Sequence, residues 1–349
     1  MNEVLIDHKE YNDKVIVIDP NGSVGEILEL HGLAVALPKK PTRQKILFHD
    51  KPKSMQMWTR LPVPKELQSI KSMDEWLEKP KEFRSKYNSY IEEEFKRRRY
   101  GVWFFNNGRA EYLTGRHYMF LQWGKIDIGY PSFLKFQQEI FIHLAACELD
   151  PRCLGQLFTK CRRSGYTNLS SSVLADEGTQ VKDKVIGIQS KTGKDAQENI
   201  FQSKLLSIFR NYPFFFKPIQ DGTTNPRIEL AFREPSKRIT KKNKTATTGE
   251  ALNTIINWKN TTNNAYDGLK LHRLYLDEAG KWENPADIRE AWRIQRTCLI
   301  VGRKVVGKAL VGSTVNPMDK GGSEYKKLWE DSDPLNRTAN GRTATGLYR

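Results

Sequence analysis

The sequence predicts an α/β fold with a central, mainly parallel sheet flanked by helices, preceded by a small N-terminal accessory segment. Three observations predict it. From residue 132 onward, short apolar strands alternate with helical patterns, which is typical of parallel sheets covered on both faces. One strand–helix junction carries a basic, glycine-containing loop, and a later strand ends in two carboxylates. Both motifs directly follow predicted apolar strands, so each lies at the end of a strand.

The composition is that of a folded, soluble chain with excess positive charge. Apolar residues make up 38% of it and charged residues 28%. The net charge of +16 favours an anionic partner, either nucleic acid or an acidic surface. The chain start lacks the pattern of a signal peptide, and no stretch approaches the ~18 apolar residues of a membrane span. The four cysteines lack metal-ligand spacing, so we expect reduced thiols and no zinc site.

Residues 1–100 are expected to form the accessory segment, with short strands followed by a mostly charged, solvated helix at 81–98. Two aromatic-rich strands should follow it and pack in the core. The predicted strands of this part are Val15–Ile18, Leu33–Leu37, Ile46–Phe48, Val102–Phe105 and Tyr118–Trp123.

Residues 101–320 are expected to form the core domain, and residues 321–349 a lid or linker. Between residues 234 and 250 lies an insertion with a basic run at 236–244, which either contacts phosphates or forms a solvated loop. From residue 132 the predicted elements are a helix at 132–148, a strand at 155–159, a helix from about Thr167, strand Val185–Gln189, a helix at 194–210, strands Ile228–Phe232 and Leu271–Leu276, a helix at 285–297 and strand Ala309–Gly312.

The segment 160–167, KCRRSGYT, follows a predicted strand and opens a predicted helix. Compared with the common phosphate loop GxxxxGK[ST], Gly165 and Thr167 are in place, Lys160 replaces the first glycine, and Tyr166 replaces the lysine. A loop of this kind points backbone N–H groups and the positive helix end at a polyphosphate. Lys160 can reach inward from the strand end and Thr167 can supply a hydroxyl to Mg²⁺. The alternative is an ordinary basic turn.

A second motif comes 110 residues after Thr167, where the strand LYLDE ends in Asp277 and Glu278. An acidic residue beside a phosphate loop can hold Mg²⁺, and a second can polarise a water against the γ-phosphate. The alternative is a strand that exits into solvent. The adjacent Asp-Glu pair favours ATP-driven motors and helicases over GTPases and small-molecule kinases.

A third apolar strand, 306–314, ends in Gly-Ser-Thr. The hydroxyls of Ser313 and Thr314 can sense the γ-phosphate and transmit its loss to a neighbouring element. The alternative is a strand followed by ordinary turn residues.

Together these residues resemble the large terminase subunit of tailed phages, in particular lambda-like and crAss-like members. The phosphate loop is similar to the variant K-x-x-R-x-G-Y-[ST], in which the lysine has moved to the loop's start. Further similarities are the acidic strand Leu274–Glu278, the element Ala265–Gly268, the coupling motif Gly312–Thr314, the upstream pair Phe136-Gln137 and the closing segment Thr345–Arg349.

The resemblance implies a P-loop ATPase of the additional-strand, catalytic-Glu type, with ATP and Mg²⁺ as cofactors. It implies that Lys160 is the lysine that binds the phosphates, with Arg162 as the alternative for this role. The guanidinium of Arg163 would offset the negative charge that develops on the γ-phosphate. Thr167 and Asp277 would hold Mg²⁺ and Glu278 would orient water. Gln137 would read the adenine edge. The nucleotide-binding residues are therefore expected to be Lys160, Arg162, Arg163, Ser164, Gly165, Tyr166, Thr167, Gln137, Ser313 and Thr314.

The resemblance also implies a function, which is to drive double-stranded DNA into a procapsid without sequence preference. The implied partners are a portal protein, a small terminase subunit and further copies in a homopentameric ring, in the host cytoplasm and not in the mature virion. The arginine that such a ring takes from a neighbouring subunit is not singled out by the sequence.

Family members also carry a nuclease domain, for which only about 35 residues remain after the third strand, so we expect no nuclease activity from this chain. Two alternatives stay open: a helicase-like or other nucleic-acid remodelling ATPase, and an ATP-binding adaptor without turnover.

Overall fold

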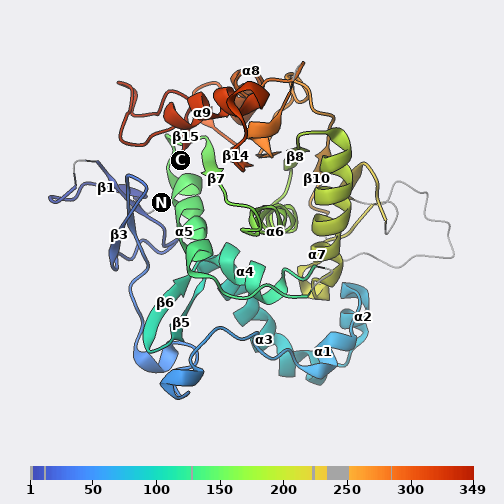
Figure 1. Cartoon of the computed structure of the whole chain (residues 1–349). Helices are drawn as coiled ribbons and strands as arrows, with labels where there is room; N and C mark the ends of the chain where they lie inside the picture. The colour runs from blue at the N-terminus through green and yellow to red at the C-terminus, as the bar shows by residue number, and fades with distance from the viewer. Residues whose placement is uncertain (1–2, 12, 127–128, 222–224, 234–250, 284) are drawn as a thin grey trace.

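The computed structural model describes residues 3–349 apart from 12, 127–128, 222–224, 234–250 and 284 (Figure 1). The basic run at 236–244 lies outside the described residues. In the described part, the predicted α/β architecture is confirmed as a large, mostly parallel sheet with helices on both faces. Among these residues, no helix combines the length and apolar character that a bilayer crossing needs.

The main sheet has the strand order β15-β7-β14-β11-β8-β10-β9. Each neighbouring pair is parallel except β10 and β9, which are antiparallel. β14 therefore lies between β7, which precedes the phosphate-loop motif, and β11, which ends in the acidic pair. The bounds are β7 Gly155–Thr159, β8 Val185–Gln189, β9 Glu229–Phe232, β10 Thr254–Trp258, β11 Arg273–Asp277, β14 Lys308–Ser313 and β15 Leu347–Tyr348.

Central strands of this sheet are buried on both faces, which explains their continuous apolar sequences. On β11, Tyr275 packs in one core cluster, while Leu274 and Leu276 pack in the other, because successive side chains point to opposite faces. One cluster contains residues of α4 (Gly115–Trp123), α5 (Lys135–Leu149), α6 (Tyr166–Gly178) and α7 (Leu206–Asn211). The other contains residues of α8 (Ile288–Gln295) and α9 (Ser323–Glu330).

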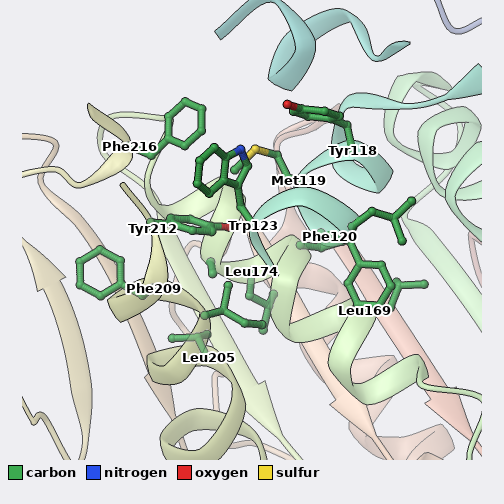
Figure 2. Packing of buried hydrophobic residues seen from close by; sticks show 14 of the residues in the cluster. Tyr118, Met119, Phe120, Trp123, Leu169, Leu174, Leu205, Phe209, Tyr212 and Phe216 are labelled. Carbon is green, nitrogen blue, oxygen red and sulfur yellow. The ribbon is translucent and has the colours of Figure 1, made fainter. Parts of the chain in front are cut away.

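The core beside α6 is rich in aromatic side chains. Figure 2 shows Trp123 of α4 beside Tyr212 and Phe216, and Phe120 of α4 on the side of Leu169 of α6. An irregular π-helical segment, Asp195–Leu205, leads into α7 on this side. This packing fixes α6, whose first turn carries Tyr166 and Thr167.

Buried ion pairs tie the far ends of α6 and β11 to the rest of the core. Arg98 donates to Asp176 at 2.7 Å, and Arg273 donates to Glu177 at 2.6 Å and also contacts Glu148. Arg98, Asp176 and Arg273 are each at most 5% exposed. Removing one partner of such a pair leaves an uncompensated buried charge, so these contacts hold α6 and β11 in a fixed relation.

The N-terminal residues form a separate four-stranded sheet of order β1-β2-β4-β3 that packs against α5 (Figure 1). Its strands are β1 Leu5–Ile6, β2 Val15–Val17, β3 Ile27–Leu30 and β4 Leu33–Ala36. The remaining elements are α1 Lys65–Ser69, α2 Met73–Glu78, α3 Lys81–Tyr100, the hairpin β5 Val102–Asn106 with β6 Arg109–Leu113, and the hairpin β12 Ile300–Val301 with β13 Lys304–Val305.

Two predicted strands are wrong. Tyr118–Trp123 belongs to α4, whose first turn is capped by Thr114, the hydroxyl of which accepts the His117 N–H at 3.2 Å. The helix is buried at nearly every position, so its apolar run carries no period that separates helix from strand. Ile46–Phe48 forms no strand, and Leu47 makes an isolated bridge to Phe104 instead.

Candidate functional site

The ends of β7, β14 and β11 bring the two sequence motifs to one edge of the sheet. Thr159 pairs with Ser313, and Gly312 pairs with Asp277. The backbone N–H of Lys160 continues the ladder by donating to the Ser313 carbonyl at 2.8 Å. Because parallel strands end together, the residues that follow them share one crevice, which is where open α/β sheets bind ligands.

Lys160 lies at the centre of this crevice. Its Nζ atom is 3.2 Å from Oγ1 of Thr167, 3.2 Å from Oδ1 of Asp277 and 3.2 Å from Oε1 of Glu278. The Lys160 residue is 9% exposed. A nearly buried ammonium group therefore contacts two adjacent carboxylates and offsets part of their negative charge.

Asp277 is fixed by neighbours that sequence reasoning missed. The Tyr275 hydroxyl donates to its Oδ1 atom at 2.7 Å, and the Trp282 indole N–H donates to its carbonyl at 3.1 Å. Burial raises the pKa of the Tyr275 hydroxyl well above its usual value, so this group stays a donor. Tyr275 precedes Asp277 by two positions on one strand face, and that spacing was the available signal.

Glu278 departs from the strand in a left-handed conformation with φ 50° and ψ 37°. A non-glycine residue in this region carries about 1–2 kcal/mol of strain, which the surrounding structure must offset. Its Oε2 atom is paired with Nζ of Lys281. Partial burial raises the pKa of Glu278, but the hydrogen bond from Lys281 and the charge of Lys160 outweigh it, and the net shift is downward.

The loop between β7 and α6 has the geometry of an anion site. Gly165, in the left-handed region with φ 77°, is the residue before α6, and Arg163 also has a positive φ of 64°. The first N–H groups of α6, a helix of 13 residues, therefore open on the loop. Gln137 on α5 supports the loop by donating from Nε2 to the Ser164 carbonyl at 3.0 Å.

Tyr166 occupies the position where the common motif has its lysine. Its ring is 1% exposed, stacks on Phe158 at 5.0 Å, and lies against Gly312, where an added Cβ would approach it to 2.3 Å. The hydroxyl reaches Gln156 at 3.4 Å. The Tyr166 ring packs into the sheet beneath the Lys160 ammonium, 5.7 Å from it, whereas Lys160 at the strand end contacts the carboxylates directly.

The loop and the acidic strand enclose a hollow of about 350 Å³. A second hollow of about 230 Å³ adjoins it and shares Thr167, Lys204, Glu278 and Lys281. The first hollow is lined by Lys160, Cys161, Arg162, Arg163, Ser164, Gly165, Tyr166, Thr167, Asn168, Lys204, Glu278, Lys281 and Thr314.

Most of the predicted site residues meet at these hollows, with Asp277 lining the second. Ser313 lines neither; it is fully buried and its hydroxyl donates to the Thr314 carbonyl at 2.8 Å. Gln137 lies beneath the loop, and its adenine-reading role stays a prediction. The hydroxyls of Ser164 and Thr314 are buried without a hydrogen-bond partner in the described part of the chain, so each can accept or donate to a ligand.

The oxygen atoms at this edge fit a hard divalent cation. Oγ1 of Thr167 and Oδ1 of Asp277 are 3.4 Å apart, and hydroxyl and carboxylate oxygens are the ligands that Mg²⁺ prefers. The Lys160 ammonium contacts both of these oxygens, each at 3.2 Å. A cation bound there with a polyphosphate would release Lys160 toward the anion, and the residues present suit both groups.

The fold and the site together define a mostly parallel α/β protein with a lysine, a hydroxyl and two carboxylates at a strand-end crevice that faces a helix N-terminus. No protein-family model matches the chain, and no curated protein matches it in sequence. Among solved structures, it is similar to the crystal structure of the HK97 bacteriophage large terminase, with 15% sequence identity and a TM-score of 0.43. The match covers 66% of this chain and 41% of that one, so the chain spans less than half of that terminase's length. A likeness of this size does not by itself identify a family.

Proposed function

We propose that this chain hydrolyses ATP with Mg²⁺ and is the motor part of a phage DNA-packaging terminase that drives double-stranded DNA into a procapsid. One observation carries the proposal. Lys160, Thr167, Asp277 and Glu278, which come from two distant segments, converge within 3.4 Å contacts beside a helix N-terminus. Positioning and electrostatic stabilisation are what phosphoryl transfer needs from a protein.

The proposed roles follow from the contacts. Lys160 leaves the carboxylates to bind the β- and γ-phosphates, while Thr167 and Asp277 hold Mg²⁺, which supplies charge neutralisation on the phosphates. Glu278 orients the attacking water. Arg163, on the exposed side of the loop, offsets charge on the γ-phosphate, and Arg162 is a second cation at the same hollow.

The strand order supports the additional-strand, catalytic-Glu type of P-loop ATPase. In that type a strand is inserted between the loop strand and the acidic strand, and β14 has this position between β7 and β11. Its end carries Ser313 and Thr314, and Thr314 lines the hollow. A change at the γ-phosphate can therefore reach the segment after β14 through Thr314.

The excess positive charge and the resemblance of the loop motif support the choice of DNA packaging among motor functions. The proposed partners are double-stranded DNA, a portal protein, a small terminase subunit and further copies of the chain in a ring, in the host cytoplasm.

Phosphate release from ATP, measured with and without linear double-stranded DNA, tests the proposal. We expect turnover that requires Mg²⁺, that rises when DNA is added, and that is lost in Asp277→Asn. Nucleotide binding without turnover in either condition would favour the adaptor alternative. Stimulation by single-stranded DNA alone would favour a helicase-like enzyme.

A further inference from the structure

The turn that follows Glu278 carries a lysine directed back at it. Ala279–Lys281 forms a single 3₁₀ turn, closed by the Lys281 N–H, which donates to the Glu278 carbonyl at 2.8 Å. The Lys281 side chain is 27% exposed, and that of Glu278 19%. Lys281 lines both hollows of the site.

The Glu278 carboxylate lies between two ammonium groups. Lys160 contacts Oε1 at 3.2 Å, and Lys281 pairs with Oε2. The two lysines differ in their other contacts. Lys160 also contacts Thr167 and Asp277, whereas Lys281 pairs with Glu278.

The backbone beneath Lys281 is held on several sides. Gly280 is buried, and an added Cβ would lie 3.0 Å from Oγ of Ser313 and 3.2 Å from Cγ of Tyr325. An added Cβ on Gly321 would lie 3.1 Å from the Gly280 carbonyl oxygen. The turn is thus packed against the end of β14 and the start of α9, so the base of the Lys281 side chain has a fixed place.

We propose that Lys281 is a positioning residue that holds Glu278 in line with the γ-phosphate. This inference rests on the proposed function and deepens it. When Lys160 turns to the phosphates, its contact with Oε1 is given up, and Oε1 becomes available to a water. The contact between Lys281 and Oε2 keeps the carboxylate in place at that moment, in its strained backbone conformation.

Ser313 and Tyr325 pack on the same turn, so the backbone that carries Lys281 lies directly against the end of β14. A small displacement of a positioned water lowers the rate of hydrolysis by a large factor. The packing of the turn against Ser313 and Tyr325 therefore links the segment after β14 to hydrolysis.

Steady-state ATP turnover and nucleotide affinity of Lys281→Met and Lys281→Arg test this role. We expect Lys281→Met to lower kcat by roughly tenfold or more, with KM and the Kd for ATP changed less than about twofold, because the lost interaction acts in the chemical step. Lys281→Arg keeps the ion pair and should restore kcat to within about threefold of wild type. In a Glu278→Gln background, Lys281→Met should cause no further loss, because the two residues act as a unit.

The matched control is Lys327→Met, which removes a lysine–glutamate pair of the same spacing, with Glu324, from the surface of α9. It should leave kcat unchanged. A rise in KM and Kd with unchanged kcat in Lys281→Met would overturn the proposal and make Lys281 a phosphate ligand. Unchanged kcat and KM would overturn it as well. A wild-type chain that binds no nucleotide and shows no turnover overturns the proposed function, and the role of Lys281 with it.

Discussion

The Nζ atom of Lys160 lies 3.2 Å from Oδ1 of Asp277, although 117 residues separate them in the chain. The contact exists because β14 pairs with both β7 and β11 and so brings their ends together. It also explains why the lysine can stand at the start of the loop, at Lys160, instead of at the position of Tyr166. A lysine at the strand end reaches the acidic pair directly, while the position that the common motif reserves for lysine points into the core.

Replacing Lys160 by Met should weaken ATP binding by at least tenfold, because a charge-assisted contact to phosphate contributes about 1.5–3 kcal/mol. Arg162→Met should cost less than threefold, because that side chain is exposed. Fluorescence titration with an ATP analogue gives both values. A larger loss in Arg162→Met would assign the phosphate role to Arg162.

Replacing Tyr166 by Lys, which restores the common motif, should destabilise the protein by about 2–4 kcal/mol without improving turnover. The reason is that the new ammonium group would be buried against Phe158 and Gly312. Tyr166→Phe is the control and should cost less than about 1 kcal/mol, because only a 3.4 Å contact to Gln156 is lost. Urea unfolding measures both. A Tyr166→Lys variant of wild-type stability and higher affinity would show that this position faces the nucleotide.

Replacing Gln137 by Ala should weaken the binding of ATP and GTP by a similar factor of about five to ten. The amide donates to the Ser164 carbonyl, so its removal loosens the loop irrespective of the base. Competition titrations with the two nucleotides measure the difference. A loss confined to ATP would instead assign Gln137 the adenine-reading role that the family resemblance implies.

Acid should destabilise the protein well before its carboxylates are protonated, because two histidines are buried. Burial lowers the pKa of His117 to about 3, and burial, with a smaller contribution from His31, lowers the pKa of His143 to about 3. As pH falls below 6.5, the unfolded chain binds these protons and the folded chain does not, so stability is lost between pH 6.5 and pH 3. Each histidine should cost about 2 kcal/mol between pH 7 and pH 5.

His117→Phe tests this slope. The His117 ring is stacked on Phe141 with 4.5 Å between centroids, and a phenyl ring suits that place. Urea unfolding at pH 7 and pH 5 should show that the variant loses about 2 kcal/mol less than wild type over this range. An identical loss in both proteins would mean that His117 already binds its proton in the folded state.

Sequence patterns predicted the elements of the sheet better than their arrangement. Strands β7 and β8 begin and end as expected, because each is a short apolar run followed by turn residues. Strand β10, Thr254–Trp258, is missing from the predicted elements, since Asn257 interrupts its apolar run. The helix α4 has the sequence pattern of a strand because burial on all sides removes the amphipathic period.

The residues of the candidate site could likewise be predicted better than their arrangement. The loop and the acidic pair were visible as local motifs, yet their meeting depends on strand order, which local patterns do not determine. Lys281 is three positions after Glu278, a spacing that becomes informative only once Ala279–Lys281 is known to form a turn. Ser313 carried a visible motif but is buried behind Thr314, which no pattern in the strand distinguishes.

Glu278 is proposed to act in the hydrolysis of a nucleotide held by Lys160, Thr167 and Asp277. The most direct measurement compares wild type with Glu278→Gln for both Mg²⁺-dependent ATP turnover and the Kd for ATP. We expect turnover to fall by at least a hundredfold, because a positioned general base contributes about 10²–10⁴-fold, with Kd changed less than about threefold. Equal turnover in the two proteins would contradict this account.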